Sequence, residues 1–103
     1  MKVTVMPGPC KMKTEVYAEK IDRNSVSLRI KTDCKFYKPI EEELSKVEIY
    51  KECFAPLGEG EIFKVCKKYC KHPSCPVPCA ILKAVEAEGK LALPTDVSIT
   101  FEK

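Results

Sequence analysis

The chain has 103 residues, of which 45% are hydrophobic and 32% charged, and its net charge at pH 7 is +3. This composition is ordinary for one folded globular domain and excludes intrinsic disorder, which needs low hydrophobicity with high net charge. The 18 basic and 15 acidic residues are too nearly balanced for a surface that neutralises nucleic-acid phosphates. The outlying feature is the seven cysteines, so thiols dominate the chemistry of this chain.

The chain carries no long apolar segment. No run approaches the roughly 20 residues that span a bilayer, and the apolar part of residues 1–6 is too short for a signal peptide. We therefore expect a cytoplasmic protein without membrane contact, whose cysteine clusters are metal ligands or redox groups. The chain has no Gln, one Asn and 28 Lys plus Glu residues, a pattern typical of hyperthermophiles. Disulfides therefore remain open, because intracellular disulfides occur in such organisms.

The first third of the chain predicts strands. Apolar and polar residues alternate with a period of two in three segments, namely residues 1–6, 13–20 and 25–31. Asp22-Arg23-Asn24 is a turn signal between the second and third segments. We therefore expect these two strands to form an antiparallel hairpin with one solvated face.

Helical spacing follows. Residues 39–47, 61–71 and 76–88 place apolar residues on one helical face, whereas residues 48–60 are poorly defined. Val97, Ile99 and Phe101 alternate with polar residues and predict a last strand that joins the sheet. The class is therefore α+β, a single domain over residues 1–103 with about four strands and three helices on one face, in the order β-β-β-α-α-α-β.

Four cysteines lie within 14 residues, with the spacing C-x3-C-x4-C-x3-C over residues 66–79. This spacing is neither that of a zinc ribbon nor that of a bacterial ferredoxin. Cys66 and Cys70 share the apolar face of their predicted helix, so they are either small buried hydrophobes or ligands. Cys75 stands just before a predicted helix, where the helix N-terminus should lower its pKa. Cys79 is one turn further on, and His72, the sole histidine, lies close by in the chain.

Cys10 and Cys34 also stand at element junctions, in the Pro7-Gly8-Pro9-Cys10 loop and after the third predicted strand. In an antiparallel sheet, the loop after the first strand and the end of the third strand lie at one edge. We expect Cys75 to join them if the last helix begins at that edge. The predicted metal ligands are the five cysteines and one histidine Cys10, Cys34, Cys75, Cys79, His72 and Cys70.

Several segments carry a resemblance: Pro7-Gly8-Pro9-Cys10, Thr32-Asp33-Cys34, Ser74-Cys75-Pro76-Val77-Pro78 and Leu93-Pro94-Thr95-Asp96-Val97. Together they resemble a small cysteine-containing domain family of methanogens and other anaerobic microbes, over nearly the whole chain. The resemblance implies a compact α+β domain with Cys10, Cys34 and Cys75 as signature cysteines, and it implies no activity. Pro73-Ser74-Cys75-Pro76 is also similar to the Thr-Ser-Cys-Pro motif of presumed metal-binding domains.

Three functions remain open. The first is a domain that binds zinc or an iron–sulfur cluster, because soft thiolates select these metals. The second is a thiol redox or sulfur-handling protein with Cys75 as nucleophile, although a Cys-x-x-Cys motif is absent. The third is a cofactor-free binding module with structural cysteines. The sequence singles out no reaction and leaves open whether the domain forms a homodimer.

Overall fold

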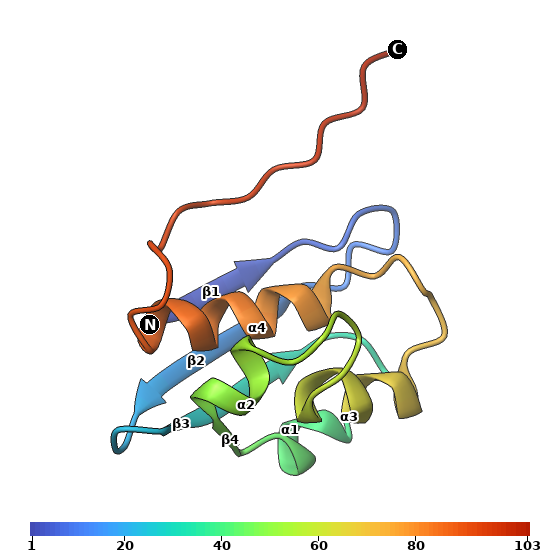
Figure 1. Ribbon diagram of the computed structural model, residues 1–103. Coiled ribbons are helices and arrows are strands. Elements are labelled where there is room, and N and C mark those ends of the chain that lie inside the picture. Colours follow the sequence, from blue (N-terminus) through green and yellow to red (C-terminus); the bar gives the residue numbers. More distant parts are fainter.

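The computed structural model describes residues 1–103 and contains a four-stranded antiparallel sheet with helices packed on it (Figure 1). The predicted α+β class is confirmed. In chain order, the elements are β1 (Lys2–Val5), β2 (Thr14–Lys20), β3 (Ser25–Thr32), α1 (Ile40–Glu43), β4 (Lys46–Glu48), α2 (Ile49–Cys53), α3 (Glu61–Tyr69) and α4 (Val77–Glu88).

The sheet has the strand order β1-β2-β3-β4, with every pair antiparallel. The predicted hairpin is confirmed: Val16 pairs with Ile30 and Ala18 with Leu28. All four of these side chains are buried, since alternate residues of a strand point to one face. That face of the sheet forms one side of the hydrophobic core.

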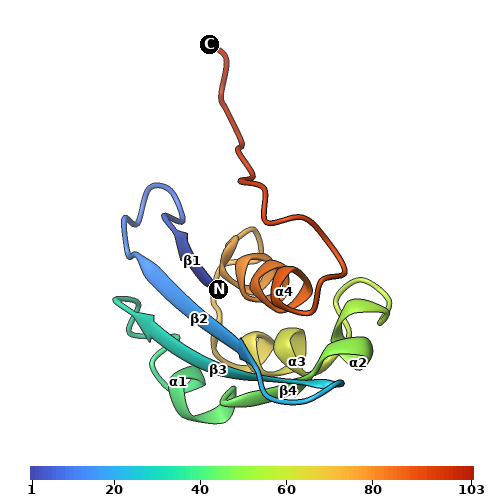
Figure 2. The ribbon, with the colours of Figure 1, turned by 90° about the vertical axis from the view of Figure 1, so that its left-hand side faces the viewer.

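Helices α2, α3 and α4 lie on one side of this sheet, with α4 packed against β1 and β2 (Figure 2). α4 buries Val77, Ile81, Ala84 and Val85, which share one helical face. Gly89 follows the last residue of α4, and a side chain does not fit there because a Cβ would meet the Ile49 Cγ2 atom at 2.8 Å. None of the helices combines the length and the apolar character needed to cross a membrane.

The buried carboxylate of Glu52 caps the N-terminus of helix α3. The Glu52 Oε2 and Oε1 atoms accept hydrogen bonds from the Glu61 and Ile62 N–H groups at 2.9 and 2.8 Å. Gly60 precedes the helix with a φ of +95°, a conformation that glycine adopts without strain. This cap fixes α3 against α2 and so positions the cysteines at its other end.

The middle of the chain differs from the prediction. The helix expected over residues 39–47 stops at Glu43, and β4 takes Val47 as its one buried residue. The poorly defined stretch contains α2. A strand of three residues is too short for a recognisable alternation, which explains why the sequence pattern did not reveal β4.

The predicted C-terminal strand is wrong for the single chain. Every residue from Lys90 to Lys103 is exposed, and this segment extends away from the body without joining the sheet (Figure 1). The fourth strand is β4 instead. An alternating sequence needs an unpaired edge beside it to become a strand, and here the chain leaves α4 in a direction away from β1 (Figures 1 and 2).

Candidate functional site

Three cysteines lie at one edge of the sheet, as the topology predicted. Val5 pairs with Thr14, and Thr14 pairs with Thr32, so the loop with Cys10 and the residue Cys34 follow strand ends at the same edge. The connection from α3 to α4, which carries Cys75, lies on this side too (Figure 1). However, no three Cys, His, Asp or Glu side chains lie close enough together to hold a metal ion in this arrangement.

The centre of the site is the hydroxyl of Tyr37. This side chain is only 2% exposed, and its hydroxyl is buried without a hydrogen-bond partner of normal geometry. The thiols of Cys70 and Cys75 lie beside it. Burial first, and these two sulfur atoms second, raise the pKa of Tyr37 far above its usual value. The phenol therefore keeps its proton at physiological pH and can donate a hydrogen bond.

Cys75 occupies a tight turn before α4. Its N–H donates to the His72 carbonyl at 3.0 Å. Burial raises the pKa of the Cys75 thiol, while the Tyr37 hydroxyl and the Val77 N–H act in the opposite direction. The predicted lowering of this pKa is therefore wrong in direction, because desolvation outweighs the hydrogen bonds that favour the thiolate.

Cys70 and Cys66 complete a group of thiols at the C-terminal end of α3. The Cys70 N–H donates to the Cys66 carbonyl at 2.8 Å, and the Cys70 thiol donates to the His72 carbonyl at 3.1 Å. Cys66 is 1% exposed. Burial, together with the nearby Cys70 and Cys75, raises its pKa to about 12. We call Cys66, Cys70 and Cys75 the inner thiols.

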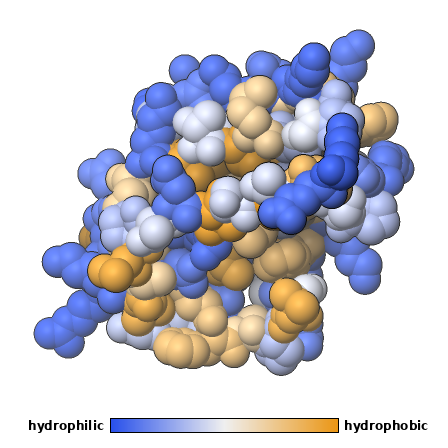
Figure 3. All heavy atoms as spheres, turned by 90° about the horizontal axis from the view of Figure 1, so that it is seen from above, coloured by the Kyte–Doolittle hydropathy of each residue, from blue (hydrophilic) through white to orange (hydrophobic).

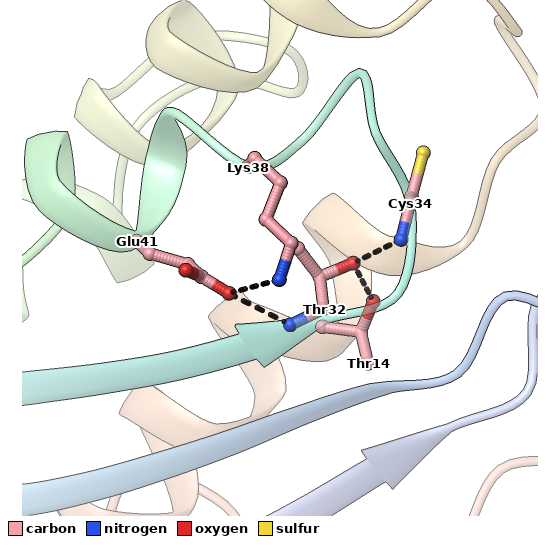
Figure 4. Close-up of polar contacts among 5 residues, drawn as sticks. All are labelled: Thr14, Thr32, Cys34, Lys38 and Glu41. Atoms are coloured by element: carbon pink, nitrogen blue, oxygen red, sulfur yellow. Dashed lines mark hydrogen bonds and ion pairs between the residues drawn. The ribbon is translucent and has the colours of Figure 1, made fainter.

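Cys34 is held at the end of β3 by a buried hydroxyl pair (Figure 4). The Thr14 and Thr32 hydroxyl groups are 2.8 Å apart, and Thr32 Oγ1 also accepts the Cys34 N–H at 3.1 Å. The Cys34 carbonyl in turn accepts the Tyr37 N–H at 3.1 Å. Cys34 is partly buried against the core, and its sulfur points away from the threonine pair (Figure 4).

Other predicted ligands stand apart from the inner thiols. Cys10 and Cys79 are both exposed, and we call them the outer thiols. The His72 Nε2 atom lies 2.9 Å from the Ser74 hydroxyl oxygen, and the hydrogen bonds between His72 and the Cys70 thiol use the His72 backbone. Cys79 does not share the buried face of α4. It lies two residues before Ile81, which is on that face, and residues two apart on a helix point in different directions.

Tyr37 was not a predicted site residue, and Cys66 was predicted only as a core or ligand alternative. The segment Lys35-Phe36-Tyr37-Lys38 holds two adjacent aromatic residues between lysines, which was the available signal. Phe36 is 53% exposed whereas Tyr37 is buried. A short irregular segment has no period, so nothing in its sequence tells which of the two rings points inward.

Comparison with known proteins confirms that the chain belongs to a family of small domains without a known activity. No curated protein and no solved structure is significantly similar to this chain. One family model matches residues 1–101, which is nearly the whole chain and includes all seven cysteines. The chain belongs to that family, which is described as a family of unknown function (DUF6951).

Proposed function

We propose that this domain binds a soft metal centre, zinc or an iron–sulfur cluster, through thiolates at the edge of the sheet. Cys70 and Cys75 are the anchoring pair, Cys34 is the third ligand and Cys10 is the fourth. Thiolate sulfur is the ligand type that zinc and iron–sulfur clusters share. This set includes the three cysteines that the family resemblance singles out in the sequence.

The partnerless hydroxyl of Tyr37 is the observation that carries the proposal. A buried hydroxyl without a hydrogen bond costs about 1–3 kcal/mol, so its neighbours should offer it an acceptor in the working state. A thiolate on Cys75 is such an acceptor, and the Val77 N–H would donate to the same sulfur.

The raised pKa of Cys75 explains why a cation is needed. Burial favours the protonated thiol, and a metal ion that replaces the proton cancels the buried charge. Two donors, one phenolic and one from the backbone, would then support the bound sulfur from outside, as second-shell groups do in metal sites. The polar groups around Cys75 thus fit a metal-bound thiolate better than a free thiol.

The choice of Cys34 and Cys10 over the remaining cysteines depends on position. Cys66 neighbours the pair but lies in the core, and burial raises its pKa to about 12, so its thiolate is costly to form. Cys34 is partly buried at the same edge. Cys10 lies in an exposed loop that includes Gly8 with a φ of +112°. Because no three of these side chains lie close enough together to hold a metal ion as the chain stands, both this loop and the segment with Cys34 would have to move toward Cys70 and Cys75 when the metal binds.

The test is anaerobic purification of the reduced protein, followed by metal analysis and a visible spectrum. We expect about one metal centre per chain. Cys70→Ser and Cys75→Ser should remove it, whereas Cys53→Ser should retain it, because Cys53 lies on α2 away from this edge. A protein without stoichiometric zinc or iron, or an equal loss in all three variants, would refute the proposal.

A second candidate is a disulfide between Cys70 and Cys75, favoured by the proximity of their sulfur atoms. Two thiols would release two protons and pass two electrons to an oxidant such as a low-molecular-weight disulfide. The raised pKa of Cys75 slows thiolate attack, which places this candidate second. Counting thiols in the denatured protein distinguishes the two: seven reactive thiols exclude the disulfide, and five support it.

A further inference from the structure

The C-terminal segment after α4 has the sequence of a strand but no partner strand. Val97, Ile99 and Phe101 alternate with polar residues and are 61%, 80% and 85% exposed. We call residues 95–102 the tail. The backbone hydrogen bonds of the region beyond Lys90 are local, from Leu91 to Glu86 and from Thr95 to Leu93. Three large apolar side chains on one face of an extended chain are a surface that water disfavours.

β1 is an outer strand of the sheet, and no strand pairs with its other side. Met1 and Ala18 exchange two backbone hydrogen bonds, of 2.9 and 2.8 Å, so Val3 and Val5 also bond toward β2. The N–H and C=O groups of Lys2 and Thr4 therefore point outward and are unpaired. Met1 and Met6, at the two ends of β1, are 43% and 60% exposed. The face seen from above, from which the tail leaves, has apolar side chains between the charged ones (Figure 3).

We propose that the tail of one chain pairs with the β1 edge of a second copy, and that the exchange is mutual. An in-phase register places Val3 and Val5 beside tail residues of the same alternation, so apolar side chains continue the inward face of β1. In the parallel register Lys2 stands opposite Asp96, and in the antiparallel register it stands opposite Glu102. Lys2 already pairs with Glu15 at 3.2 Å on the solvent face, and both directions bring a second carboxylate to the same ammonium group.

A second copy is the occupant because the chain's own tail extends away from its own β1. Figures 1 and 2 agree that the segment leaves the end of α4 and runs outward from the sheet. Lys90, with a φ of +61°, forms the turn that sends it in this direction. The tail of one copy is then free to reach an edge on another, and the symmetric exchange closes as a two-fold dimer.

The test measures mass in solution by size-exclusion chromatography with light scattering, on the full chain with its thiols reduced. We expect about twice the 11.6 kDa of one chain. Ile99→Asp should return the protein to the mass of a single chain, because a charge on the apolar face of the tail opposes its burial. Leu57→Asp is the matched control: Leu57 is 96% exposed in a different loop, and the variant should stay a dimer.

Isotope-filtered NMR on a mixture of labelled and unlabelled chains then identifies the partner strand. We expect contacts between the Thr4 amide of one chain and the Ile99 side chain of the other. A single-chain mass for the unaltered protein, a dimer that survives Ile99→Asp, or contacts of the tail with β1 of its own chain would each overturn the proposal. The proposal does not depend on the thiols, so metal content has no bearing on these outcomes.

Discussion

The inner and outer thiols belong to one short chain but occupy opposite environments. Cys75 is partly buried beside Tyr37, whereas Cys79, four residues later, is exposed. Four residues on a helix would share a face, but α4 begins only at Val77, so Cys75 belongs to the preceding turn. Cysteine spacing therefore predicts a shared position only when both cysteines lie inside one element.

The largest expected difference is in the alkylation rate of the metal-free, reduced protein at pH 8. Because burial raises the pKa of Cys66 to about 12, its thiolate fraction at this pH is about 10⁻⁴, and iodoacetamide reacts with the thiolate. We expect peptide mass spectrometry to show modification of Cys66 roughly a thousandfold slower than that of a cysteine of ordinary pKa, and far slower than that of Cys79, which is exposed. Lowering the pH should slow it further. Equal rates for the two cysteines in the native protein would remove the contrast.

The second prediction separates the two outer thiols. Cys10→Ser should weaken metal binding by more than the roughly 10- to 100-fold that loss of an outer-shell partner costs, because Cys10 is a proposed ligand. Cys79→Ser should leave the affinity within about twofold, a change too small to indicate a lost ligand. Competition with a chromophoric chelator measures both. A larger loss in Cys79→Ser than in Cys10→Ser would reverse the proposed ligand set.

The third prediction concerns Tyr37, whose two roles have opposite consequences. Tyr37→Phe removes a buried hydroxyl without a partner, so the metal-free protein should be unchanged or up to about 1 kcal/mol more stable in urea unfolding. The same variant should bind metal about tenfold more weakly, since the donor to the Cys75 sulfur is lost. A variant with unchanged affinity would show that the hydroxyl serves no bound thiolate.

The last prediction concerns the hydroxyl pair that supports Cys34 and has no direct part in metal binding. Thr32→Val leaves the Thr14 hydroxyl and the Cys34 N–H without the partner they have now, which should cost about 1–2 kcal/mol. For a domain of this size the midpoint of thermal unfolding should fall by roughly 4–8 °C per kcal/mol. Thr32→Ser, which retains the hydroxyl, should recover most of the loss. A Thr32→Ser variant as unstable as Thr32→Val would assign the effect to packing instead.

Much of the fold was predictable because its main elements carry complete periods. The hairpin of β2 and β3 and the helices α3 and α4 have enough residues for a period of two or 3.6 to be unambiguous. β4 and α2 have three and five residues and show no usable period. In the tail the alternation is clear, yet the segment forms no strand, because it has no partner strand in the sheet of its own chain.

The candidate site was predictable only to the level of the sheet edge. Strand direction places Cys10 and Cys34 at that edge, and the helix boundary adds Cys75. The orientation of Tyr37 and the closeness of Cys70 to Cys75 depend on how irregular segments pack, which local pattern does not encode. The predicted direction of the Cys75 pKa shift was wrong for the same reason, since burial of this thiol in the fold outweighs the hydrogen bonds from Tyr37 and Val77 that lower its pKa.

X-ray absorption spectroscopy at the zinc edge, on the reduced protein loaded with Zn²⁺, reads out the proposed thiolate ligands themselves. The proposed site predicts a first shell of four sulfur atoms at about 2.3 Å. It also predicts that Cys75→Ser loses sulfur from this shell and Cys79→Ser does not. A shell of nitrogen and oxygen at about 2.0–2.2 Å, or a sulfur count that Cys75→Ser leaves unchanged, would contradict it.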